Sequence, residues 1–147
     1  MRTLKDLSDR LNKLADKVEA APSKVAASFS LVLIDELVLR TPVDTSKALS
    51  NWLMSLNDPI YIDMNAYYEG VFGSTFSSSR TEVLKHAHTI AGRKKAGQSL
   101  YITNAAPYIM ELERGTSTQA PTGFTKQSIF AAKSKLPGII KKVLADG

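Results

Sequence analysis

The chain has no cysteine among its 147 residues. A disulfide framework and a thiolate zinc site are therefore both excluded, and the absence of cysteine suits a reducing cytosol. Its apolar runs, such as Leu31 to Ile34, are far shorter than the ~20 residues that a membrane-spanning helix needs. Charged residues alternate with leucines in the opening MRTLKDLSDR, so we expect neither a signal peptide nor a membrane segment.

The sequence also has few residues that could carry catalysis. His86 and His88 are the only histidines, and at a spacing of two on a helix they point apart. Glu111 and Glu113 have the same spacing, so they do not form a facing carboxylate pair. The glycines at 70 and 73 lack the lysine of a phosphate-binding loop. We therefore expect no enzyme activity, no metal and no cofactor, although a Ser-His-Asp triad could assemble from distant residues.

Charge is distributed unevenly along a chain whose net charge is +5. The stretch from Arg80 to Lys95 holds five basic residues and one acid, and the stretch from Lys126 to Lys142 holds five lysines and no acid. Residues 35–69, by contrast, hold six acids and two basic residues. Such segregation suits docking between like subunits or onto DNA, and two solvated basic faces are the alternative.

The N-terminal part of the chain predicts two helices of one 1–147 domain. In the first, over residues 1–21, a narrow apolar seam repeats at three-four spacing and requires a single partner, either the same domain or a neighbouring subunit. The seam consists of Leu4, Leu7, Leu11, Leu14 and Val18. The second helix begins at Pro22 or Ser23, is apolar over most of its circumference, and should end at Arg40 because Pro42 follows. We expect this second helix to be the core helix.

The middle of the chain predicts a small antiparallel sheet. The expected strands are residues 49–56, 60–62 and 99–103, with 67–72 as a further strand or an aromatic turn. Between them, residues 73–98 are polar, basic and bracketed by Ser and Gly, which predicts a long mobile insertion loop containing a weak amphipathic helix. The aromatic residues around this loop either stack on bases or fill the core and interfaces.

The last helix is expected over Thr125 to Leu144, with a kink or restart at Pro137. The predicted fold class is therefore α+β: two N-terminal helices, a small antiparallel sheet with a long inserted loop, and a C-terminal helix. The stretch NAAPYIMELERGT, residues 104–116, organises this arrangement. Asn104 and Pro107 end a strand, and Gly115 ends a helical turn with a positive φ.

This stretch, together with TPVDTS at residues 41–46, resembles the head–tail joining, minor-tail proteins of tailed phages, the gene-product-ten-like morphogenesis family. The resemblance covers about residues 26–132 and departs from the family pattern at Ser46, Ile109 and Arg114. The motif positions are Pro42, Asp44, Asn104, Pro107, Gly115, Thr116 and Phe124.

The resemblance implies a structural virion protein of the phage neck or tail end, assembled in the host cytoplasm. Such proteins form rings, here a hexamer or a twelve-fold ring, that contact head connector or adaptor proteins and the tail tube or its terminator while DNA passes through the channel. A DNA-binding accessory protein using the basic loop and the last helix is the alternative. The candidate interface residues are Asp44, Arg80, Arg93, Lys94, Lys95, Tyr108, Glu111, Glu113 and Arg114. For Asp44, a turn that fixes the exit from the core helix is the competing interpretation.

Overall fold

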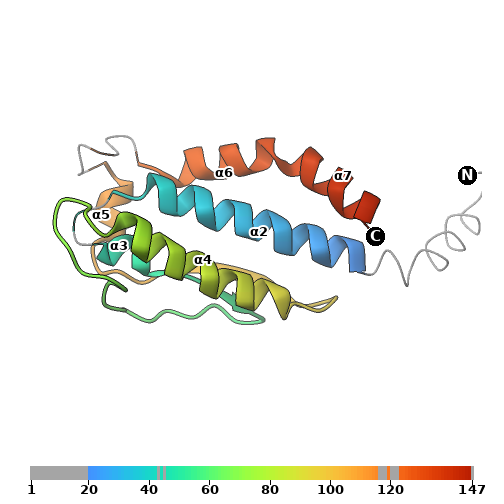
Figure 1. The fold of residues 1–147 in the computed structure, drawn as a ribbon, viewed down its shortest axis with the longest axis horizontal. Helices are drawn as coiled ribbons and strands as arrows, with labels where there is room; N and C mark the ends of the chain where they lie inside the picture. Colours follow the sequence, from blue (N-terminus) through green and yellow to red (C-terminus); the bar gives the residue numbers. More distant parts are fainter. Residues whose placement is uncertain (1–19, 43, 45, 116–118, 120–122, 147) are drawn as a thin grey trace, which may run out of the picture.

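The central element is helix α2, Ala20–Arg40, along which three other helices, α4, α6 and α7, pack (Figure 1). The computed structural model describes residues 20–42, 44, 46–115, 119 and 123–146. Pro22 lies in the first turn of α2, where its missing N–H has no helical partner to lose. At the other end, the Thr41 amide and hydroxyl both donate to the Leu37 carbonyl, at 2.9 and 2.6 Å. The prediction of a core helix that stops before Pro42 is confirmed.

The sheet has two strands in the described part of the chain. Helix α3, Lys47–Ser50, leads into β1, Trp52–Leu56, which pairs antiparallel with β2, Leu100–Asn104. The register places Trp52 opposite Asn104 and Leu56 opposite Leu100. The strand expected over residues 49–56 is shorter than predicted, because residues 49 and 50 belong to α3. The strand expected at residues 60–62 is wrong, and residues 67–72 form a turn, which was the second of the two predicted alternatives. The backbone of this segment bonds to side chains rather than to a neighbouring strand.

The segment 73–98, predicted as a long insertion loop containing a weak amphipathic helix, is mostly helical. Most of it forms α4, Phe76–Gly92, which packs on α2 and β1. Ser79, Val83, Ala87 and Ala91 recur at a spacing of four and are all buried. Three of these four side chains are small, so α4 can pack closely on α2 and β1 although its sequence is only weakly hydrophobic. The argument for mobility, that the segment had little to bury, therefore no longer applies.

The C-terminal part contains three helices: α5, Ile109–Glu113; α6, Thr125–Ser134; and α7, Leu136–Asp146. The predicted restart is confirmed, since α6 ends before Lys135 and Pro137 lies in the first turn of α7. Helices α6 and α7 follow one side of α2, and α4 follows the other (Figure 1). Residues 1–19 of the predicted N-terminal helix lie outside the described residues, and residues 20 and 21 belong to α2, which includes two residues before the predicted start at Pro22 or Ser23. In the described ranges the fold is thus six helices with one two-stranded antiparallel sheet.

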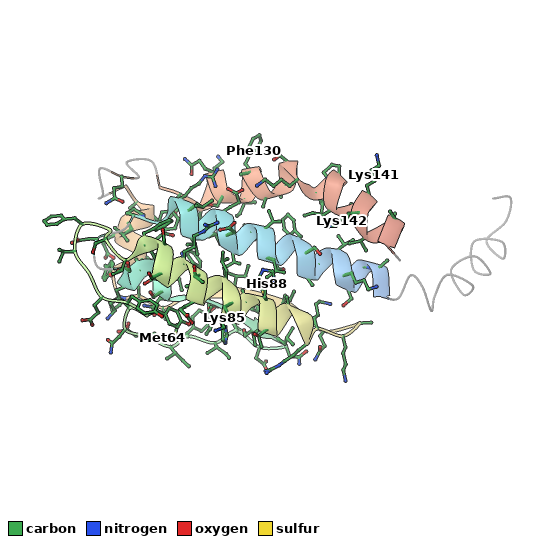
Figure 2. All side chains as sticks on the ribbon, in the orientation of Figure 1. Met64, Lys85, His88, Phe130, Lys141 and Lys142 are labelled. Atoms are coloured by element: carbon green, nitrogen blue, oxygen red, sulfur yellow. The ribbon has the colours of Figure 1, made fainter. Side chains whose placement is uncertain are left out.

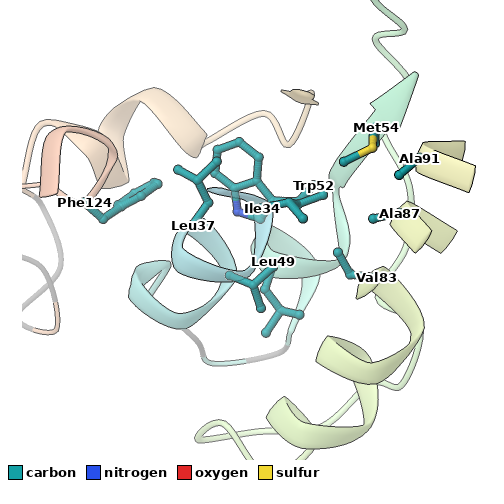
Figure 3. Close-up of a cluster of buried hydrophobic side chains, with 10 residues drawn as sticks. Ile34, Leu37, Leu49, Trp52, Met54, Val83, Ala87, Ala91 and Phe124 are labelled. Atoms are coloured by element: carbon teal, nitrogen blue, oxygen red, sulfur yellow. The ribbon is translucent and has the colours of Figure 1, made fainter. Parts of the chain in front are cut away.

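The core joins these layers around Trp52 and Phe124 (Figure 3). Their rings meet edge to face with centroids 6.2 Å apart, and Phe124 is fully buried. The Trp52 indole N–H donates to the Thr41 hydroxyl at 2.8 Å, which ties β1 to the end of α2. On the far side of Ile34, Val83 and Ala87 bring α4 into the same cluster.

A buried carboxylate holds α6 and α7 to α2. Glu36 is 6% exposed, and it accepts hydrogen bonds from Lys135, at 2.7 Å, and from Arg40. The Lys135 bond first, and then Arg40, lower the pKa of the Glu36 carboxyl below its usual value of 4.5. Ser128 of α6 adds a 3.1 Å bond to the Glu36 carbonyl. The two helices are therefore fixed in position along α2.

Candidate functional site

Residues 57–75, here called the display loop, carry half of the large apolar side chains that the described chain exposes. The loop forms neither helix nor strand. Phe72 is 94% exposed and Tyr61 72%. The exposed apolar side chains of the loop are Ile60, Tyr61, Ile62, Tyr67, Tyr68, Val71 and Phe72. Large exposed apolar side chains that form a patch are typical of interaction sites, so the display loop is the candidate site.

Buried side chains of α3 and its C-cap fix the middle of the display loop. The Asn51 side chain donates to the Met64 carbonyl at 2.8 Å and accepts from the Met64 amide at 2.7 Å. The Ser50 hydroxyl accepts from the Tyr67 amide at 3.1 Å. Ser50 and Asn51 are both buried. These side chains form the hydrogen bonds to the loop backbone that a neighbouring β-strand would otherwise form, so they fix the conformation of the loop.

Both ends of the loop are held in the same way. At the first end, the Thr103 hydroxyl of β2 donates to the Ile60 carbonyl. Toward the second end, the Ser79 hydroxyl of α4 accepts from the Tyr68 amide at 3.2 Å and donates to its carbonyl at 3.3 Å. Asp44 accepts from the Phe72 amide at 2.7 Å through its carboxylate and from the Gly73 amide at 2.9 Å through its carbonyl. The loop is therefore preorganised along its length.

Phe72 combines the largest exposure with an unusual backbone conformation. Its φ is 55°, in the left-handed region that large side chains rarely adopt. Such a residue costs of order 1–3 kcal/mol and persists only where its surroundings fix it. The bond from the Phe72 amide to Asp44 provides that fixation. The structure thus holds an aromatic ring out in solvent at the expense of local strain, which is a feature of binding sites.

The electrostatic character of the loop is acidic. No lysine or arginine occurs between Lys47 and Arg80, whereas Asp58, Asp63 and Glu69 all lie in the loop. Asp63 pairs with Lys47 at 3.2 Å. Burial, with a smaller contribution from Glu82, raises the pKa of the Tyr67 hydroxyl above its usual value of 10, so the phenol stays neutral. The site is an apolar surface with acidic residues along it.

The sequence-predicted basic residues do not gather into one face. Arg80, at the start of α4, makes a bidentate ion pair with Asp35 of α2, with distances between 2.8 and 3.1 Å. Arg93 is at the other end, roughly 20 Å away along a helix that rises 1.5 Å per residue. Lys94 donates to the Ser23 hydroxyl at 2.8 Å, and Lys95 is exposed beside it. Arg80 and Lys94 thus bind within the chain.

The stretch 104–116 is mainly structural. The Asn104 side chain donates to the Ala48 carbonyl at 2.7 Å and accepts from the Ala106 amide at 3.0 Å, which ends β2 and fixes it to α3. The Glu113 carboxylate accepts from the Thr125 amide, at 3.0 Å, and from the Thr125 hydroxyl, at 2.6 Å. It therefore caps α6. Gly115 has the expected positive φ, 91°.

The remaining sequence-predicted interface residues of this stretch are on the surface. Tyr108, Glu111 and Arg114 are exposed, as is the motif residue Pro107. Phe124, predicted as a motif position, is in the core. Thr116 lies outside the described residues.

The described residues hold no group of three or more His, Cys, Asp or Glu side chains that could bind a metal ion. His86 is half-buried and His88 is exposed on α4. None of the helices in the described ranges has the length and apolar character needed to cross a membrane.

Sequence reasoning missed the display loop as a unit. The signal available was the density of large apolar residues, eight between positions 60 and 72, in a stretch from 48 to 79 that has no lysine or arginine. No protein-family model, curated protein or solved structure matches the chain.

Proposed function

We propose that this chain acts by binding other proteins and not by catalysis, as a structural subunit of a phage neck or tail end. The observation that carries the proposal is the display loop, whose exposed Tyr61 and Phe72 stand on a fixed backbone. That backbone is bonded to the buried side chains of Asn51 and Thr103 and, at Phe72, to the exposed Asp44. A preorganised surface binds without the entropic cost of ordering a flexible loop. Such a site suits permanent assembly.

The sequence resemblance supplies the assembly in which this surface acts. A joining protein closes a ring, with six or twelve copies, and contacts a head connector on one side and the tail tube or its terminator on the other. The ring requires each copy to carry two different docking faces. The display loop is one such face, and its acidic and apolar character suits a partner that is basic and apolar.

The proposal is tested by electron microscopy of lysates from a phage that lacks the gene. We expect filled heads and separate or defective tails, with few joined particles, and recovery of joined particles when the wild-type gene is supplied in trans. Normal infectious particles in the absence of the gene contradict the proposal.

DNA binding is the second candidate, and the lysines of the C-terminal helices favour it. Lys126, Lys133 and Lys141 are exposed on α6 and α7. Phosphate binding through them releases counterions, so affinity for duplex DNA should fall steeply as salt rises. Sub-micromolar, salt-dependent binding to bare duplex supports this candidate, whereas absence of binding at physiological salt supports protein docking.

A further inference from the structure

Helices α6 and α7 have an outer stripe that combines apolar and basic side chains. Successive residues of this stripe are three or four apart in the sequence, so their side chains lie on the same side of the helix pair. The stripe consists of Lys126, Phe130, Lys133, Pro137, Lys141 and Leu144. Phe130 is 77% exposed and Leu144 60%, whereas Ser128 and Ala132 on the inner side are fully buried. Figure 2 shows Phe130 and Lys141 pointing away from α2.

The outer stripe and the display loop have complementary chemistry. Both present large exposed apolar side chains, with Phe72 in the loop and Phe130 in the stripe. The loop carries three acids and no basic residue, and residues 125–145 carry five lysines and no acid. Two of those lysines are oriented inward, since Lys135 binds Glu36 and Lys142 faces α2. Lys126, Lys133 and Lys141 remain on the outer side of α6 and α7.

The display loop runs along the lower edge of the molecule and round the end near α3 and α5, whereas the outer stripe is on the upper edge (Figure 1). In Figure 2, Met64 of the loop is on the lower edge, and Phe130 and Lys141 are on the upper edge. Helices α2 and α4 separate them (Figure 1). One copy therefore cannot bring its own loop onto its own stripe, whereas two copies stacked in the same direction can. A contact between two different faces repeats from copy to copy and closes into a ring when the rotation permits.

We propose that the display loop of one copy docks on the outer stripe of α6 and α7 of the next copy. The inference rests on the proposed function, of which it defines the subunit contact. Phe72 and Phe130 lie at the apolar centre of this contact. The acids of the loop, of which Asp63 also pairs with Lys47 of its own copy, face the three outward lysines. The stripe is roughly 28 Å long at 1.5 Å per residue, a length suited to an interface of ordinary size.

Disulfide trapping tests the contact directly, because the chain has no cysteine of its own. Ser74→Cys is next to the loop aromatics and Ser134→Cys is next to Phe130, and both serines are exposed. Separately purified copies of these two variants are mixed and oxidised. We expect the mixed 74–134 disulfide to form at least five times faster than the mixed disulfide of a control pair, Ser74→Cys with Thr89→Cys. Equal rates for the two pairs overturn the proposal.

A second mixture distinguishes this contact from chance collision. Phe72→Asp and Phe130→Asp replace side chains that are largely in solvent, so neither should prevent folding. When Phe130→Asp is on the Ser74→Cys copy and Phe72→Asp is on the Ser134→Cys copy, the trapped contact keeps both aromatic rings and the fast rate should persist. In the second of these mixtures, Phe72→Asp is on the Ser74→Cys copy and Phe130→Asp is on the Ser134→Cys copy. The trapped contact then lacks both aromatic rings, and the rate of disulfide formation should fall to that of the control pair. Equal rates in the two mixtures, which contain the same four substitutions, overturn the proposal.

Failure of this inference is separable from failure of the proposed function. If lysates lacking the gene contain only unjoined heads and tails but the 74–134 disulfide forms at the control rate, the subunit contact is wrong and the function stands. If the lysates contain normal particles, the proposed function is wrong whatever the disulfide result.

Discussion

The side chain of Asn51 and the backbone of Met64 exchange two hydrogen bonds, one donated and one accepted, at 2.8 and 2.7 Å. The same Asn51 amide also donates to the Lys47 carbonyl at 2.8 Å. A single buried side chain thus connects the end of α3 to the display loop. The position of the exposed aromatic surface depends on residues inside the fold.

Replacing Asn51 by Asp should release the display loop. A carboxylate cannot donate, so the Lys47 and Met64 carbonyls lose their donor and face a negative charge, at a cost of about 1–3 kcal/mol. Chymotrypsin, which cuts after aromatic residues, should cleave the loop of Asn51→Asp at least ten times faster than the wild type. Asn65→Asp is the control, since Asn65 is in the same loop and exposed. Equal cleavage of the two variants contradicts the assigned role of Asn51.

Replacing Glu36 by Gln should destabilise the protein more at neutral pH than in acid. The folded state holds the Glu36 pKa below 4.5, so its contribution is complete above about that pH and is lost as pH falls through the lowered pKa. Hydrogen bonds to a charged group contribute about 1.5–3 kcal/mol. Urea unfolding, followed by the fluorescence of the single tryptophan, Trp52, should show this difference at pH 7 and a smaller one at pH 3. A difference that is the same at both pH values contradicts the assignment, and exposed Glu69→Gln should show little effect at either.

Two glycine-to-alanine substitutions should change stability in opposite directions. Gly123 has a φ of 84°, and a Cβ there would lie 2.4 Å from the Glu113 carbonyl oxygen, so Gly123→Ala should cost at least about 1–2 kcal/mol. Gly138 is in α7 with nothing within 4 Å of a Cβ, so Gly138→Ala should add about 0.5–1 kcal/mol. Thermal unfolding of both variants measures this, and a stable Gly123→Ala protein would disprove the close approach of Gly123 to Glu113.

The sequence predicts the elements that carry strong local signals. The apolar circumference of α2, the Thr41–Pro42 stop and the Pro137 restart all appear in the structure, because each depends on neighbouring residues alone. The strand over residues 99–103 is found one residue later, where the Asn104 side chain bonds to the Ala48 carbonyl and the Ala106 amide.

The elements that sequence reasoning misses depend on distant contacts. The alternation around Ile60 to Ile62 favours a strand, but the backbone of that part of the loop is held by Thr103 and Asn51 side chains. Helix α4 begins with serines that suggest a loop, yet Ser79 is buried because its hydroxyl bonds to Tyr68. The tertiary structure also decides which charged residues are free to bind a partner. Arg80, for example, forms an ion pair with Asp35, which is 45 residues away in the sequence.

The most direct test of the account is to add purified protein back to extracts that contain unjoined heads and tails from a phage lacking the gene. Wild-type protein should restore joined particles seen by electron microscopy, and so should Thr89→Asp, which changes an exposed residue of α4. Phe72→Asp should fold normally, as judged by Trp52 emission and unfolding, because Phe72 is 94% exposed, but it should restore few or no joined particles. Equal restoration by Phe72→Asp and wild-type protein would contradict the claim that the display loop is a docking face for assembly.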